Sequence, residues 1–327
     1  MFSQLLLKLP APRMADWRFS VSLAMMSLCE SGECLVICTD AMATLGAISA
    51  DRIAKKDAPL HKDWTASYVG DDMGHAPPII GRAQTILGRA GERTADQVAN
   101  ALAQAYDERL QRQIERKILK KHRFTAESFR DQGKRKMTEV AYNRIVDRIE
   151  KTSLKCEFLV GGFESASKAK LFSVDGESEP MSYDDLGFWA IGSGAAVAIG
   201  ALGFFAEKSL FGLHNSPEEA IYFLLQAKFT AETVRTVGRE SLIIVRRFND
   251  SNLRYLSPIG FNLVRTAWEK RGAPRVPMGI SKEISKYIWD ASDFTDIPKL
   301  TELFLTKGQR RRLKAKQSDS QTSESKQ

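Results

Sequence analysis

The sequence predicts an α+β protein in which antiparallel β-sheets are covered by helices that pack in pairs. Two observations predict this class: strand-like segments come in pairs, and pairs of amphipathic helical segments follow them. A third observation excludes a doubly wound parallel sheet, because the strict alternation of strand and helix is absent. With 327 residues the chain can bury one large core or two modest ones.

The first strand pair is expected at residues 19–28 (FSVSLAMMSL) and 33–40 (ECLVICTD). The linking Cys-Glu-Ser-Gly predicts a hairpin, since glycine supplies the backbone freedom that a tight turn needs. A further short strand is predicted at residues 64–72 (WTASYVGDD).

Two long helices should follow a shorter one at residues 75–89. Thr94 and Gln97 form a capping-box pattern, and the apolar residues after them recur at helical spacing. The second long helix is expected at residues 125–150. Together they form a long helical pair, within residues 92–150, that is more polar than a core helix requires.

Strands return at residues 156–163 and 168–175, and an apolar stretch follows at 186–207 (LGFWAIGSGAAVAIGALGFFAE). Its length suits a membrane span of roughly 20 residues. However, Gly192-Ser193-Gly194 interrupts it, and such a triplet is typical of a turn. The stretch is therefore interpreted as a buried strand (188–191), a turn, and a helix from about Ala195.

The last predicted elements are a helix and a buried strand. Ser216, Pro217 and Glu219 give a strong helix start, with the helix reaching about Val234. A buried strand at 241–248 (SLIIVRRF) follows, and two or three short helices are expected beyond it.

Net charge is +8, and much of the excess lies at residues 111–124 and 308–316. This balance permits a nucleic acid or another acidic partner without requiring one. We interpret 111–124 as a solvated face, because Phe124 is its one aromatic residue for stacking on a base.

Cys34 and Cys38 share one face of a predicted strand and should point into the core. Reduced cysteines and a cytoplasmic location are expected.

Cofactor and metal sites are not predicted. The four histidines are scattered, and the cysteine spacings are not those of zinc sites. Asp71 and Asp72 near His75 could hold part of a metal site, but a solvated turn is the preferred interpretation because further ligands are missing. The Gly-Ser-Gly triplet lacks the Lys-Ser/Thr of a phosphate-binding P-loop.

Six segments, taken in order over about residues 18–248, resemble proteasome subunits and their bacterial relatives. They are CTDAMATLG, YVGDD, CEFLVGGFESASKAKLFSVDGES, WAIGSGAAVAIGAL, NSPEEAIYFLLQA and VGRESLIIVRR. The resemblance implies the N-terminal nucleophile (Ntn) hydrolase fold, a four-layer α-β-β-α sandwich. It would occupy residues 15–248 with an enlarged helical pair, followed by a C-terminal extension (249–308) and a disordered basic and polar tail (309–327).

The resemblance also implies a site. In this family an N-terminal Thr, Ser or Cys, exposed by self-cleavage, is the nucleophile, and its own amine serves as the base. Asp40 matches the family's aspartate after the second strand, and Ser193 matches the serine of the Gly-Ser-Gly turn. The lysine position falls between Arg52 and Lys56, with Arg52 the closest fit. Arginine is a poor substitute because it stays protonated.

The nucleophile falls at about Phe19 or Ser20 when counted back from Asp40. Ser20 is the predicted nucleophile and Ser22 the alternative, and either would act only after the preceding residues are removed. The family also has an aspartate and a serine before its last strand, and TVGRESL offers neither in register.

Three hypotheses about function follow. The first is a proteasome-like amide-bond hydrolase or peptidase acting on a peptide or protein substrate. The second is a non-catalytic subunit that keeps the fold for self-assembly, and the third is a nucleic-acid-associated protein that uses the basic helix and tail. A homo-oligomer is expected under the first two, without membrane attachment.

Overall fold

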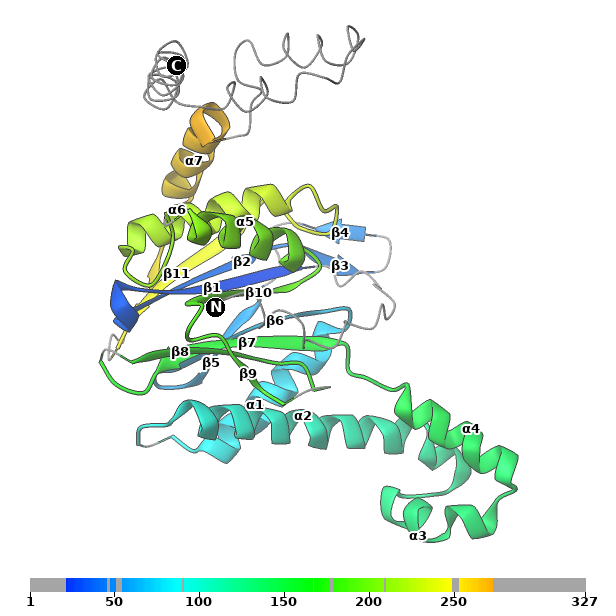
Figure 1. Cartoon of the computed structure of the whole chain (residues 1–327). Helices are drawn as coiled ribbons and strands as arrows, with labels where there is room; N and C mark the ends of the chain where they lie inside the picture. The colour runs from blue at the N-terminus through cyan, green and yellow to red at the C-terminus, as the bar shows by residue number, and fades with distance from the viewer. Residues whose placement is uncertain are drawn as a thin grey trace, which may run out of the picture. The chain divides into compact units, whose positions relative to one another are not determined.

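Two five-stranded antiparallel sheets face each other in the computed structural model (Figure 1). The structure describes residues 22–45, 48–50, 55–89, 91–166, 168–176, 179–208, 210–248 and 253–272. This arrangement confirms the mixed α+β class and the antiparallel pairing that the sequence predicted. The predicted extension and tail boundaries beyond residue 272 lie outside the described residues.

The first sheet has the strand order β10-β1-β2-β11-β12, and the second has the order β5-β6-β7-β8-β9. A separate short hairpin joins β3 to β4. The bounds are β1 Leu23–Cys29, β2 Cys34–Asp40, β3 Ala43–Leu45, β4 Ile48–Ala50, β5 Asp57–His61, β6 Trp64–Gly70, β7 Cys156–Phe163, β8 Ala169–Val174, β9 Met181–Ser182, β10 Phe188–Gly192, β11 Ser241–Arg247 and β12 Arg254–Tyr255.

Strands β1 and β2 form the predicted hairpin, with Cys29 opposite Cys34 and Ala24 opposite Thr39. Residues 30–32 make the turn, and all three have positive φ angles. Alternate residues of the two strands face opposite sides, as the two-residue period of a strand requires. Cys34 and Cys38 face the helices and are fully buried, which confirms the prediction that they point into the core.

Three apolar clusters hold the two sheets to each other and to the helices packed against them. One, which includes Met26, Leu35 and Leu159, fills the space between the two sheets. A second joins the first sheet to α5 (Ala195–Glu207) and α6 (Pro217–Ala231), and a third joins the second sheet to α1 (Ala76–Leu87) and α2 (Ala95–Lys117). The first cluster thus contacts both sheets, and each of the other two contacts one sheet and one pair of helices (Figure 1).

The apolar stretch at 186–207 is a strand and a helix, as predicted. Strand β10 ends at Gly192, and α5 begins at Ala195. Across the described residues, none of the helices combines the length and the apolar character that crossing a membrane requires.

The predicted long helix at residues 125–150 is wrong in one respect, because it is two helices, α3 (Ala126–Lys136) and α4 (Glu139–Glu150). Met137 adopts an extended conformation, and the Thr138 side chain accepts a hydrogen bond from Ala141 N at the start of α4. A threonine at this position caps a new helix, which ends the preceding one. The capping box of α2 at Thr94 and Gln97 is present as predicted.

Beyond the last long strand, one helix packs back onto the body of the protein. Helix α7 (Pro258–Ala267) is capped by Ser257 and continues into a single π-helical turn at residues 268–272. Phe261 of α7 is buried against Phe229 of α6, with ring centroids 5.8 Å apart. The helix predicted at the Ser216 cap is α6, and it ends at Ala231, three residues before the predicted end.

Candidate active site

Four chain segments meet at one end of the first sheet. Ser22 directly precedes β1, Asp40 ends β2, and Ser193 follows β10. Neighbouring strands are antiparallel, so the start of β1 lies beside the ends of β2 and β10. Lys56, directly before β5 of the second sheet, reaches the same place.

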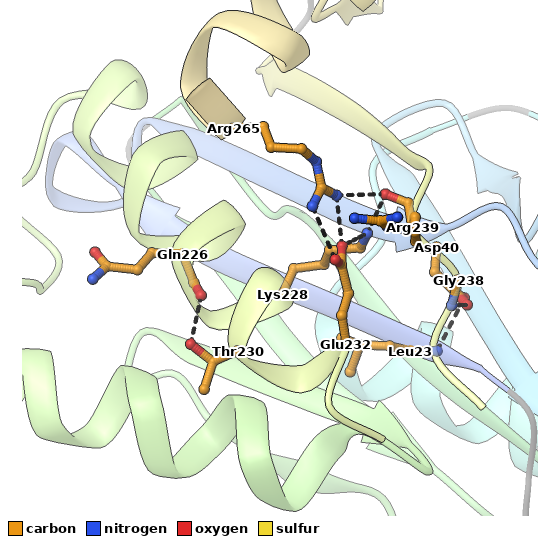
Figure 2. Close-up of polar contacts among 9 residues, drawn as sticks. All are labelled: Leu23, Asp40, Gln226, Lys228, Thr230, Glu232, Gly238, Arg239 and Arg265. Atoms are coloured by element: carbon orange, nitrogen blue, oxygen red, sulfur yellow. Dashed lines mark hydrogen bonds and ion pairs between the residues drawn. The ribbon is translucent and has the colours of Figure 1, made fainter. Parts of the chain in front are cut away.

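The Asp40 carboxylate is buried and accepts hydrogen bonds from three segments. Its Oδ1 accepts from Leu23 N at 3.0 Å and from Lys56 Nζ at 2.5 Å. Its Oδ2 accepts from Gly238 N at 3.0 Å (Figure 2). A buried carboxylate is tolerated when it is paired and hydrogen-bonded, and both conditions hold here.

Lys56 connects this carboxylate to a serine hydroxyl. Its side chain has no exposed surface, and Nζ donates to Ser22 Oγ at 2.8 Å while it pairs with Asp40. Ser22 is also fully buried. The arrangement gives a serine oxygen a cationic hydrogen-bond donor whose charge is balanced from behind, which can stabilise negative charge that develops on that oxygen.

The backbone of Ser22 is held by two further hydroxyl groups. Ser22 N donates to Ser193 Oγ at 3.4 Å, and Ser193 Oγ donates to the Ser22 carbonyl oxygen at 3.2 Å. Thr236 Oγ1 lies 2.6 Å from Ser193 Oγ. With the Ser193 proton directed to the Ser22 carbonyl, Thr236 is the donor in that contact. Both polar groups of the Ser22 backbone are therefore fixed by one side chain.

Gly192 explains why the apolar stretch is broken by a Gly-Ser-Gly turn. Its φ angle is +97°, and a Cβ at this position would lie 2.4 Å from the Ser22 carbonyl oxygen. Any other residue would push the turn away from Ser22. The glycine thus brings Ser193 within hydrogen-bond distance of the Ser22 backbone.

Glu157, a titratable group beside this turn, carries no sequence motif that would predict a role for it. The pKa of Glu157 is raised to about 7: burial raises it most, the charge of Asp175 also raises it, and a hydrogen bond from Gly192 N–H lowers it. Glu157 lies on β7, so its carboxyl group links the second sheet to the Gly-Ser-Gly turn.

The sequence-predicted site residues divide into two groups. The structure brings Asp40 and Ser193 together, whereas Ser20 and Arg52 lie outside the described residues. Beside Asp40 the structure has Ser22, the alternative nucleophile, and at the end of the interval predicted for the lysine it has Lys56.

Thr236 was not predicted, because the family resemblance implies an aspartate and a serine before the last strand and no threonine. The available indication was the position of Thr236 in the loop directly before β11. The sequence does not show which residue of that loop lies beside Ser193.

The possible metal ligands near His75 are engaged with each other. Asp72 Oδ2 lies 3.3 Å from His75 Nε2, and Arg109 Nε donates to His75 Nδ1 at 3.1 Å. Both ring nitrogens therefore have protein partners. Within the described part of the chain, metal-binding side chains do not gather in groups of three or more.

A comparison with solved structures gives the type of fold. The Anbu (Gly-1) mutant from Hyphomicrobium sp. strain MC1 matches with a TM-score of 0.52 and 15% sequence identity, over 81% of this chain and 97% of that one. The chain has a proteasome-like fold. At this identity the likeness shows the fold alone. The chain matches no protein-family model and no curated protein.

Replacing Asp40 by asparagine is expected to lower the free energy of unfolding by about 3–5 kcal/mol, because a buried ammonium loses its counter-ion. The double variant D40N/K56M should recover part of this loss, since it removes the unpaired charge as well. Urea unfolding of the wild type, D40N, K56M and D40N/K56M measures the coupling free energy between Asp40 and Lys56. A double variant no more stable than D40N would contradict the importance of the ion pair.

Glu157→Gln is expected to make the protein more stable than the wild type at pH 8. The pKa of Glu157 is higher in the folded state than in the unfolded chain. The stability that its protonated form contributes is therefore fully present below pH 4.5 and is lost as the pH rises through about 7. The gain at pH 8 should be about 1–2 kcal/mol, because the carboxyl group is partly screened by solvent. Unfolding free energies measured from pH 5 to pH 8 test this, and a difference that does not grow with pH would contradict it.

Proposed function

We propose that the protein is an Ntn-type amide-bond hydrolase whose nucleophile is Ser22, exposed by cleavage of the Val21–Ser22 bond. The observation that carries the proposal is the contact of Lys56 Nζ with Ser22 Oγ at 2.8 Å, while the same ammonium pairs with buried Asp40. The proteasome-like fold supports it. The four-layer α-β-β-α arrangement belongs to the same proposal and is supported by the three apolar clusters.

In the proposed reaction, cleavage turns the Ser22 amide nitrogen into a primary amine. This amine takes the proton from Ser22 Oγ, and the oxygen attacks the carbonyl carbon of a peptide bond to form a tetrahedral oxyanion. The protonated amine then gives its proton to the departing amine, which leaves an ester on Ser22. The same amine then takes a proton from a water molecule, whose oxygen adds to the ester carbonyl. The bond from the carbonyl carbon to Ser22 Oγ breaks, the protonated amine returns its proton to Oγ, and the acid is released.

The remaining residues position and stabilise these groups. Lys56 stabilises negative charge on Ser22 Oγ, and Asp40 holds Lys56 in place. Ser193 orients the Ser22 nitrogen, and Thr236 orients the Ser193 hydroxyl. The proposed substrate is a peptide or protein, the class that the family resemblance implies.

We expect the protein to assemble with copies of itself, as the proteasome-like fold suggests. A cytoplasmic location is expected because Cys29, Cys34, Cys38 and Cys156 are all free and buried.

In the alternative, non-catalytic function, the same Lys56–Asp40 pair would serve only to join the two sheets in an assembling subunit.

A β-lactone probe, which acylates activated hydroxyl nucleophiles, separates these functions. Wild-type protein should be labelled at Ser22, as located by tandem mass spectrometry, and Ser22→Ala should abolish the labelling. Ser20→Ala is the matched control and should be labelled as the wild type is. Labelling at Ser20 would overturn the choice of nucleophile. Folded protein without label at either serine would favour the non-catalytic subunit.

A further inference from the structure

A network of charges lies behind Asp40, on the side of the first sheet covered by α6 and α7 (Figure 2). Lys228 is its buried member, and Glu232 and Arg265 are partly buried. Lys228 of α6 has no exposed surface, and its Nζ donates to the Glu232 carboxylate and, at 2.5 Å, to the carbonyl oxygen of Arg239. Arg265 of α7 donates two hydrogen bonds to Glu232, at 2.9 and 2.6 Å, and a third to the same Arg239 carbonyl at 2.7 Å. Two cations from two helices therefore meet on one backbone carbonyl.

The carbonyl that they hold lies one residue from the candidate site. Gly238, which precedes Arg239, donates its N–H to Asp40 Oδ2 at 3.0 Å. Thr236, two residues earlier, contacts Ser193. The contacts thus run without interruption from the α7 arginine, through residues 236–239, to the carboxylate that pairs with Lys56.

This loop needs support because the sheet does not supply it. Residues 232–240 contain neither helix nor strand, and pairing with β2 begins at Ser241 opposite Asp40. Backbone contacts with the sheet start only one residue earlier, where Ala41 N donates to the Glu240 carbonyl at 3.1 Å. Within the loop, Val237 N donates to the Val234 carbonyl at 3.0 Å, and the Val237 side chain is buried in the core. The contacts on the Arg239 carbonyl hold the other side of Gly238.

The surroundings of the network restrict its movement. The Arg265 guanidinium lies 4.2 Å from the centroid of the Phe229 ring and 5.2 Å from that of Phe261. Both rings are buried.

Burial lowers the pKa of Lys228, and the neighbouring Glu232 charge opposes that shift. Removing one member of such a network leaves another charge without its partner, so the positions of Lys228, Glu232 and Arg265 depend on one another.

We propose that Arg265 is a positioning residue for the candidate site: helix α7 holds the loop at residues 236–239, which keeps Gly238 N–H on Asp40. The proposal rests on the proposed function for its catalytic consequence. It makes α7, which follows the last long strand, part of the apparatus that orders Lys56 and Ser22.

Hydrogen exchange of the Gly238 amide in the full-length protein tests the proposal without a substrate. Arg265→Met removes all three of the Arg265 hydrogen bonds and should increase the exchange rate at Gly238 by at least tenfold. Lys270→Met is the matched control, because it removes an exposed cation from the adjoining π-helical turn. Its exchange rate at Gly238 should equal that of the wild type.

Arg265→Lys keeps the charge but loses the two-pronged contact with Glu232, and it should raise the exchange rate two- to fivefold. If Arg265→Met does not fold, Arg265→Lys decides the question. Unchanged exchange at Gly238 in the folded variants would overturn the proposal. A rise in Gly238 exchange equal to that of amides throughout the chain would also overturn it, since it would indicate a purely structural role.

The rate of β-lactone labelling gives the catalytic consequence. If Ser22 is the nucleophile, the probe should label Ser22 of the Arg265→Met variant at least tenfold more slowly than Ser22 of the Lys270→Met variant. Wild-type protein that is not labelled at Ser22 would contradict the proposed function, while the Gly238 exchange would still decide whether Arg265 positions the loop. Labelling of Arg265→Met at the wild-type rate would contradict the positioning role in catalysis.

Discussion

The Asp40 carboxylate is the constraint on which the rest of the candidate site depends. A buried anion must be neutralised and hydrogen-bonded, and Asp40 obtains this from the start of β1, from Lys56 of the second sheet and from the loop before β11. Each donor comes from a segment far from the others in sequence. Satisfying one carboxylate therefore fixes how the two sheets and the last loop meet.

The Gly-Ser-Gly turn adds the second constraint. Gly192 allows the turn to approach the Ser22 carbonyl closely, and Ser193 then holds both polar groups of the Ser22 backbone. Ser22 is thus fixed through its backbone by the turn and through its hydroxyl by Lys56. Orientation of this kind is what a serine nucleophile requires, because its reactivity depends on a base within hydrogen-bond reach.

Most of the fold could be predicted because its signals are local. The hairpin at residues 30–32, the Ser216 capping box and the break at Gly192 each depend on a few adjacent residues. The division of residues 125–150 was missed because Thr138 resembles an ordinary helical position until its capping bond is seen. Strand β5 carries Pro59, which obscured it as a strand, so the interval from Arg52 to Lys56 could not be narrowed to Lys56.

The site was harder to predict because it depends on register. Asp40 and Ser193 lie in recognisable motifs, whereas the choice between Ser20 and Ser22 depends on the length of the β1–β2 turn. The pairing of Ala24 with Thr39 puts Ser22 at the end of the sheet beside Asp40. Contacts between distant segments, such as Arg265 with the Arg239 carbonyl, have no sequence signal, since nothing local relates α7 to that loop.

The intact mass and N-terminal sequence of the purified protein test the central claim, that Ser22 becomes an N-terminal nucleophile, most directly. The protein is produced from the full-length sequence, with a Ser22→Ala variant made in parallel. The account predicts a mature chain that begins at Ser22 and a variant that keeps the preceding residues. A wild-type chain that retains the residues before Ser22 would contradict it.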